Sequence, residues 1–187
     1  MLEFNFHPFP VIETERLTLR RITLTDIPFV FSVRSDAEIM KYIDKPLAKS
    51  EADVMPLFEQ METALAANLG ISWILVLKET AQPVGQIGFW RIDRENHRAE
   101  VGYILSKAFF GKGLGSEALK LALTYGFTTL KFHSIEANVN PENLASNRIL
   151  EKQGFVREAY FRENFYYNGK VLDTAIYSLL ASDMYPE

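Results

Sequence analysis

The chain of 187 residues contains no cysteine. Without cysteine it can form no disulfide, bind no metal through thiolates and carry no acyl group on a cysteine sulfur during catalysis. Histidine is also scarce, because only His7, His97 and His133 occur, far apart in the sequence. These positions do not have the spacing of metal ligands, and we expect no metal site.

Long hydrophobic runs and clusters of one charge are missing as well. The longest clean apolar run, residues 74–77, is far shorter than the roughly 20 residues that cross a bilayer. The first residues, MLEFNFHPFP, include Glu3 and lack the basic start of a secretory signal. The net charge of −4 comes without a basic stripe, which argues against nucleic-acid binding. We therefore expect a soluble cytoplasmic protein that binds neither membranes nor nucleic acid.

Hydrophobic residues make up 48% of the chain, which is enough for a full core, and the length suits one domain over residues 1–187. Alternating and helical patterns then predict the order of the elements. Strands are expected at 17–22, 71–78, 84–92, 99–106, 134–139, 155–167 and 170–180, and helices from 25, over 50–68, from 113 and over 140–154, the last with Asn140 as its N-cap.

This order predicts a mixed sheet. Strand, helix and strand over residues 99–139 form a crossover, which normally makes two neighbouring strands parallel. Hairpins on either side, the last turning at Asn168-Gly169, add antiparallel strands. We expect a mixed α/β (α+β) fold, in which helices flank a mostly antiparallel sheet with one parallel pair.

The stretch FFGKGLGSEA, residues 109–118, places three glycines at the start of a helix. A helix start leaves N–H groups free, and its dipole favours an anion, so such a turn is typical of a phosphate site. A plain flexible loop is the alternative. The pattern Gly113-x-Gly115-x-x-Ala118, with Glu136 about 20 residues on, also matches a dinucleotide fingerprint, although only one strand–helix–strand unit is present. No P-loop pattern occurs.

The element order, the strand AEVGYIL before the glycine turn, the segment ANVNPENLASNRILEKQGF and the hairpin NGKVLD together resemble the GCN5-related N-acetyltransferases (GNAT). The resemblance runs from Glu13 to Leu179 and is nearest to the Rim-type branch, which acetylates the N-termini of ribosomal proteins. It implies the acyl-CoA N-acyltransferase (GNAT) fold and acetyl-CoA as co-substrate. The pyrophosphate of acetyl-CoA is then expected on the backbone of residues 111–116.

Two positions depart from the common pattern of the superfamily. The turn usually begins with Gln or Arg, and Phe110 stands there, as an aromatic residue often does in the Rim-type branch. The tyrosine that often serves as general acid is replaced by Leu150, and the resemblance passes this role to Ser146, which shares a helix face with Asn143. The cofactor-binding residues implied are Tyr103, Ile104, Leu105, Phe110, Gly111, Lys112, Gly113, Leu114, Gly115, Ser116, Asn138, Asn143 and Ser146.

The chemistry implied is direct transfer of an acetyl group to an amine, with the proton of the amine taken by a base. Glu100 is the first candidate for this base and Glu136 the second. Either carboxylate could instead be an ordinary surface group, and alternation allows Glu100 to point into water. For Asn143 and Ser146 the plain alternative is a polar outer helix face.

The acceptor implied is the α-amine of a protein N-terminus, and a polyamine or another small amine is the alternative. Asp26, Asp36 and Asp44 could attract a cationic acceptor or could be helix caps and solvated loop acids. A dinucleotide-binding enzyme and a non-catalytic module that binds CoA are more distant alternatives. The chain is expected to be a monomer or a homodimer.

Overall fold

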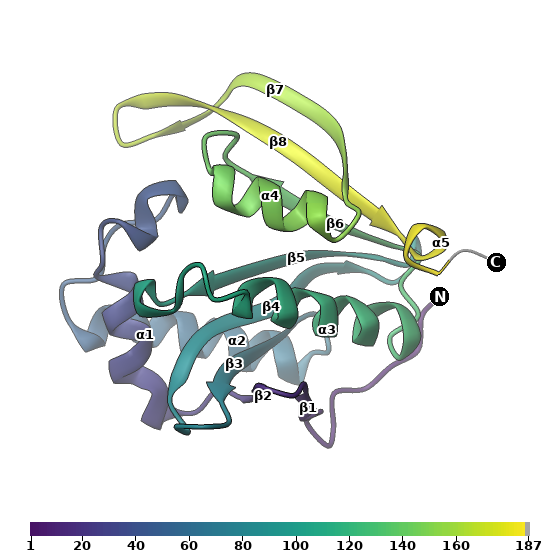
Figure 1. The fold of residues 1–187 in the computed structure, drawn as a ribbon, viewed down its shortest axis with the longest axis horizontal. Helices are drawn as coiled ribbons and strands as arrows, with labels where there is room; N and C mark the ends of the chain where they lie inside the picture. Colours follow the sequence, from purple (N-terminus) through teal and green to yellow (C-terminus); the bar gives the residue numbers. More distant parts are fainter. Residues whose placement is uncertain (186–187) are drawn as a thin grey trace.

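A single eight-stranded sheet runs through the molecule (Figure 1). The structure is a computed structural model and describes residues 1–185. The strands lie side by side in the order β1-β2-β3-β4-β5-β6-β8-β7, and only β5 and β6 are parallel. The predicted mixed sheet with one parallel pair is confirmed. The strands are β1 (Ile12–Glu13), β2 (Leu17–Arg21), β3 (Ile71–Leu77), β4 (Pro83–Asp93), β5 (Arg98–Leu105), β6 (Ser134–Val139), β7 (Val156–Tyr167) and β8 (Lys170–Leu180).

Helices cover both faces of this sheet (Figure 1). Successive side chains of a strand point to opposite faces, so β3 buries Trp73 and Leu75 on one side and Ile74 on the other. The first side packs against the third helix and the second side against the first two helices. The helices are α1 (Ile27–Arg34), α2 (Met55–Ala66), α3 (Leu114–Thr128), α4 (Leu144–Lys152) and α5 (Ala181–Met184).

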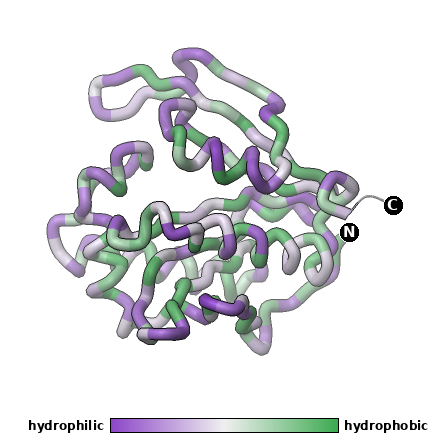
Figure 2. Tube along the Cα trace, viewed as in Figure 1, coloured by the Kyte–Doolittle hydropathy of each residue, from purple (hydrophilic) through white to green (hydrophobic). Residues whose placement is uncertain are grey.

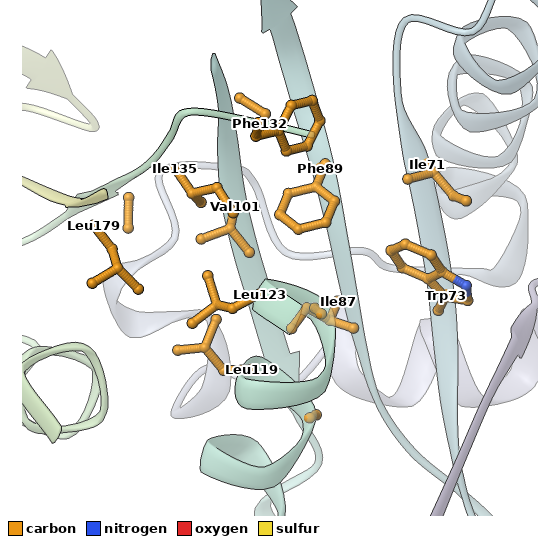
Figure 3. Close-up of a cluster of buried hydrophobic side chains, with 14 of the residues drawn as sticks. Ile71, Trp73, Ile87, Phe89, Val101, Leu119, Leu123, Phe132, Ile135 and Leu179 are labelled. Carbon is orange, nitrogen blue, oxygen red and sulfur yellow. The ribbon is translucent and has the colours of Figure 1, made fainter. Parts of the chain in front are cut away.

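The larger core lies between α3 and the sheet. Leu119 and Leu123 of α3 are fully buried there against Ile87, Phe89 and Val101 of the central strands (Figure 3). Along the chain, hydrophobic and hydrophilic stretches alternate in the helices, as in elements with one buried side (Figure 2). No helix among residues 1–185 is both long and apolar enough to cross a membrane.

The helix predicted over 140–154 begins later than expected. Its N-cap is Asn143, whose Oδ1 accepts from the Ser146 N–H at 3.1 Å, and the helix proper starts at Leu144. Asn140 instead closes a turn, with Oδ1 accepting from the Glu142 N–H at 2.9 Å. The prediction of Asn140 as N-cap was wrong, because two Asn side chains three residues apart compete for the same role and only packing decides between them.

The ends of other elements also differ from the predictions. The predicted start near Thr25 is a short 3₁₀ turn, Leu24–Asp26, that leads into α1, and Glu51–Val54 leads into α2 in the same way. The Ser50 N–H donates to Asp53 Oδ2 at 3.0 Å, as the sequence predicted for this helix start. The two-residue strand β1 and the one-turn helix α5 were not predicted, because elements this short have no periodicity to detect.

Candidate active site

An opening between β5 and β6 forms the centre of the candidate site. The two strands pair only over Arg98–Glu100 and Ser134–Glu136, although β5 continues to Leu105 and β6 to Val139. The Ser106 N–H donates to the Val84 carbonyl at 2.9 Å, so even-numbered residues in this part of β5 turn their backbone toward β4. Tyr103 and Leu105 therefore direct their backbone N–H and C=O groups toward the β6 side, where a ligand can pair with them.

The glycine turn leads directly into α3. Gly111 and Gly113 have φ of 72° and 77°, a region that side chains disfavour, and Gly113 is the N-cap of the 15-residue helix. The first intrahelical donor at this end is the Glu117 N–H, which bonds the Gly113 carbonyl at 3.1 Å. The amides of Leu114, Gly115 and Ser116 have no intrahelical acceptor, which is the arrangement that binds a phosphate.

Arg16, which is distant from the glycine turn in the sequence, contacts this turn and stabilises it. Its Nη1 donates to the Lys112 carbonyl at 3.1 Å, and its Nε donates to Glu117 Oε2 at 2.7 Å. Thr14 also donates its hydroxyl to Glu117. The guanidinium is half exposed and adds positive charge beside the helix start. Nothing in the local sequence around Arg16 indicates this position.

The remaining residues of the turn contribute packing and surface. A Cβ on Gly115 would come within 2.8 Å of Leu105 Cδ1, so this glycine lets α3 lie close to β5. Ser116 Oγ accepts from Gln153 Nε2 at 2.7 Å, which joins the start of α3 to the end of α4. Phe110 is 48% exposed, and Lys112 Nζ lies 5.0 Å from the centre of the Phe109 ring.

A hydroxyl pair joins β5 to α4. Tyr103 Oη lies 2.9 Å from Ser146 Oγ, and either atom can donate. Ser146 is in the first turn of α4, held by the Asn143 cap, and Asn143 Nδ2 still has both of its hydrogens to donate. Leu150, one turn further along, is fully buried and packs in the core. Asn143 and Ser146, which were predicted to act as a pair, therefore lie next to each other, and the Tyr103 hydroxyl contacts Ser146.

Burial raises the pKa of the Tyr103 phenol to about 12, and the hydrogen bond with Ser146 opposes this only in part. The folded state thus keeps the proton at a pH where an unfolded tyrosine, with a pKa near 10, has begun to lose it. Stability from this difference is complete below pH 10 and is lost as the pH rises toward 12. Tyr103 is therefore a neutral hydrogen-bond donor at every pH at which the site would work.

Between pH 8 and pH 11, we expect the ionisation of Tyr103 alone to lower the free energy of unfolding by about 1 kcal/mol. Urea unfolding of the wild type and of Tyr103→Phe at both pH values measures this change. The wild type should lose that much more stability than the variant. Tyr166→Phe, which alters a 70% exposed ring, is the control and should follow the wild type. Equal losses in all three proteins would show that Tyr103 ionises normally.

The two candidate bases are neighbours in the register of β5 and β6. Glu100 is only 8% exposed, and its Oε2 accepts from Arg91 Nη1 at 2.8 Å. It therefore does not point freely into water, which was the alternative that strand alternation allowed. Glu136 is half buried and forms an ion pair with Arg98. Both carboxylates already have a guanidinium partner, so a proton can reach either one only at an oxygen that the arginine leaves free, or after the ion pair opens.

A cavity of about 720 Å³ opens on the face of the sheet that carries α1 and α2. Tyr103, Ile104 and Asn138 line it, which brings three of the predicted residues to its wall. Trp90 lies directly over Gly102, where a Cβ would collide with the indole ring at 1.9 Å. The volume is that of a typical small-molecule site, and it reaches the opening between β5 and β6 through Tyr103.

Three basic side chains, Arg34, Lys45 and Arg91, also line this cavity, and the described residues of its wall include no aspartate or glutamate. Sequence reasoning missed all three, together with Arg16, Trp90 and Gln153. Their positions in the site depend on contacts between elements that are far apart in the sequence, which no local pattern predicts. The charge of this wall bears on which ligand can enter the cavity.

Comparison with known proteins identifies the family. Residues 16–156 match the acetyltransferase (GNAT) domain model. The chain is 33% identical over 172 residues to the uncharacterized N-acetyltransferase YoaA of Bacillus subtilis, covering 92% of this chain and 97% of YoaA.

Two solved structures share the fold equally well. The spermidine N-acetyltransferase from Vibrio cholerae, in complex with CoA and spermine, has a TM-score of 0.81 and 26% identity over 91% of this chain and 99% of that one. The ribosomal-protein-S5-alanine acetyltransferase from Vibrio fischeri also has a TM-score of 0.81, with 23% identity over 95% of this chain and all of that one, and shows the fold alone. With its eight-stranded sheet, one parallel pair and glycine turn, the chain belongs to the acetyltransferase (GNAT) domain family and is an N-acetyltransferase.

Proposed function

We propose that the protein transfers the acetyl group of acetyl-CoA directly to the α-amine of an acceptor, with Ser146 as the proton donor. The observation that carries this proposal is the position of Tyr103. Its backbone faces the opening between β5 and β6, its hydroxyl lies 2.9 Å from Ser146 Oγ, and it lines the cavity. One residue thus connects the opening, the hydroxyl of α4 and the space for an acceptor.

The residues around the opening fit acetyl-CoA, which supplies an activated acetyl thioester when it is bound. The free amides after Gly113 suit its pyrophosphate, with Arg16 and Lys112 adding positive charge. The backbone of Tyr103 and Leu105 and the amide of Asn143 can pair with the peptide-like arm. The N–H groups of β5 are also placed to polarise a carbonyl oxygen that lies in the opening.

Ser146 and Tyr103 form a short chain of donors. Because Tyr103 stays protonated at working pH, we assign it the donor role toward Ser146 Oγ, which leaves the serine hydrogen free for the departing sulfur. Positioning of the two substrates supplies much of the remaining acceleration. An α-amine has a pKa near 8 and is partly neutral at pH 7. A weaker general base is therefore enough for it than for a lysine-like amine, which has a pKa near 10.

Glu100 remains the first candidate for this base and acts through water, since Glu100 does not line the cavity. Arg91, which does line it, stays charged and can only hold the Glu100 carboxylate in place. Glu136, paired with Arg98, is the second candidate.

The charges of the cavity favour an α-amine over a polyamine. A polyamine carries several positive charges and needs carboxylates, but the described lining residues include only basic ionisable groups apart from tyrosine. Two of the acids that could have attracted a cation are structural. Asp26 is buried in a bidentate pair with Arg20, and Asp36 accepts from the Glu38 and Ile39 N–H groups at the start of a 3₁₀ turn.

The motifs around Phe110 and Ser146 resemble the Rim-type branch, and this resemblance implies a ribosomal-protein N-terminus as the acceptor. We keep it as the first member of the α-amine class to test. The spermidine enzyme of Vibrio cholerae has the same fold and makes a polyamine the second candidate.

An amine screen tests this function. Purified protein is incubated with acetyl-CoA and, in separate reactions, peptides with ribosomal-protein N-termini, free amino acids, spermidine and spermine. Released CoA is measured with a thiol reagent, which has no background from a protein without cysteine. Turnover with α-amines and little with polyamines is expected. Preference for spermidine would reverse the choice of acceptor, and tight acetyl-CoA binding without turnover on any amine would indicate a non-catalytic module.

A further inference from the structure

The cavity on the α1 and α2 face contains a partly buried guanidinium that has no carboxylate partner among residues 1–185. Arg34 is the last residue of α1, and its Nε is inaccessible to solvent and has no hydrogen-bond partner. Its Nη1 donates to the Met40 sulfur at 3.9 Å, which is a weak acceptor. The arginines of β2 and β5 are each in an ion pair with a carboxylate, as Arg20 is with Asp26. Arg34 is in no such pair, and it lines the cavity.

The surroundings of Arg34 do not neutralise it. Burial lowers the pKa of its guanidinium, and no carboxylate counteracts this effect. An arginine nevertheless stays charged in proteins, so its burial has to be compensated by an anion or by water. Lys45 and Arg91 add two more positive charges to the same wall. Of these, Arg91 is balanced by Glu100. Lys45 is next to Asp44, a carboxyl outside the wall whose pKa is raised by burial and lowered in part by the charge of Lys45.

We propose that Arg34 and Lys45 bind an oxyanion carried by the acceptor, so that the natural substrate is an amine with a nearby carboxylate or phosphate. This inference rests on the proposed acetyl transfer and narrows its acceptor. A protein N-terminus, whose α-carboxyl is in an amide bond, fits it only where an acidic or phosphorylated side chain lies beside the amine. The amine would lie toward Tyr103 and the opening, and the oxyanion toward α1 and the loop after it. An α-amino acid is the simplest compound with this arrangement, and an aminoalkyl phosphate is the other source of the same chemistry.

The first experiment compares pairs of amines that differ only in the anion. L-amino acids are compared with their carboxamides, and phosphoethanolamine with ethanolamine, with spermidine as a polycation. We expect kcat/KM for the anionic member to exceed that of its neutral partner by roughly 10- to 100-fold, the range for a hydrogen bond to a charged group. The amino group of an amino-acid carboxamide is less basic than that of the acid, so more of it is in the neutral, reactive form at pH 7.5. This difference alone would favour the carboxamide, which is the opposite of the expected result.

Variants of Arg34 then connect the preference to this residue. Arg34→Gln should lower kcat/KM for the anionic amine by roughly 10- to 100-fold and leave the neutral partner within about threefold. Arg34→Lys, which keeps the charge without the fork, should recover part of the loss. Arg21→Gln is the matched control, because Arg21 is an exposed arginine of β2 outside the cavity and its ion pair with Glu62 is worth little. Equal loss for both members of a pair, or a preference for spermidine, would overturn the proposal.

A binding measurement separates this proposal from the proposed function. N-acetyl amino acids and their amides are titrated into the protein, and the fluorescence of Trp90 is followed, since Trp90 lines the cavity and Trp73 is fully buried. Binding of the anionic compound that is lost in Arg34→Gln, in a protein that acetylates no amine, would contradict the proposed function and support the anion site. Equal binding of acid and amide, or no binding of either, would contradict the anion site even if amines are acetylated.

Discussion

Acetyl-CoA is expected to bind at least roughly 100-fold more weakly when Gly113 is replaced by aspartate. The new carboxylate would lie at the N-cap of α3, beside the free amides that we propose bind the pyrophosphate. Two like charges about 4 Å apart near a protein surface repel each other by about 4 kcal/mol, which more than covers this loss. Calorimetric titration of acetyl-CoA into the wild type and the variant measures the change.

Gly113→Asn is the matched control for this prediction. Asparagine has the shape of aspartate without its charge, and both tolerate the left-handed backbone that φ of 77° requires better than other side chains do. Arg16 Nη2 lies 3.6 Å from the position that a Cβ would take, and in the wild type the guanidinium is already bonded to Glu117 and to Lys112. If the Asp and Asn variants lose the same affinity, strain is the cause. Unchanged affinity in Gly113→Asp would mean that the turn does not hold the pyrophosphate.

Replacement of Ser146 by alanine is expected to lower kcat by roughly 100-fold, at the lower end of what proton transfer by a positioned side chain contributes. Acetyl-CoA affinity should change little, because the proposed pyrophosphate site lies at the start of α3 and Ser146 lies in α4. The fold should tolerate the change well. The Asn143 cap bonds the backbone N–H of residue 146, which alanine keeps, and alanine favours a helix. Steady-state kinetics and acetyl-CoA titration on the same preparation measure both quantities.

The double variant tests whether Tyr103 works through Ser146. Tyr103→Phe alone should lower kcat, whereas adding it to Ser146→Ala should have little further effect, because groups that act as one unit are not additive. Ser32→Ala, which removes an exposed serine of α1, is the control for an unrelated hydroxyl. Unchanged turnover in Ser146→Ala would remove Ser146 from the mechanism, and additive losses would mean that the two hydroxyls act separately.

The glycine turn illustrates how far the sequence could be interpreted. Three glycines before a helix predicted an anion site, and two of them do adopt left-handed backbone, at 72° and 77°. Gly115 has a different reason to be glycine, since it packs α3 against Leu105. The dinucleotide alternative depended on the same residues. It fails because the sheet has one parallel pair and antiparallel neighbours elsewhere, which is not a doubly wound sheet.

The carboxylates show the opposite case. The sequence placed Glu100 on a strand but could not say whether it faced water, because strand alternation assigns a side chain to one of two faces without saying what covers each face. In the structure it is buried beside Trp90 and paired with Arg91, which adopts a left-handed backbone at φ of 48°. The helix after 140 similarly had two asparagines able to cap it, and packing selected Asn143.

The sequence by itself determined the mixed sheet, the crossover at 99–139, the turn into α3 and the absence of thiol chemistry, since these follow from residues close together along the chain. Only the tertiary structure decided which side chains meet. Arg16 contacts the glycine turn, Tyr103 contacts Ser146, and Arg34 has no carboxylate partner in the described part of the chain, residues 1–185. The energy of a charge or a hydroxyl depends on every group within a few ångström, and these neighbours come from segments whose approach no local pattern encodes.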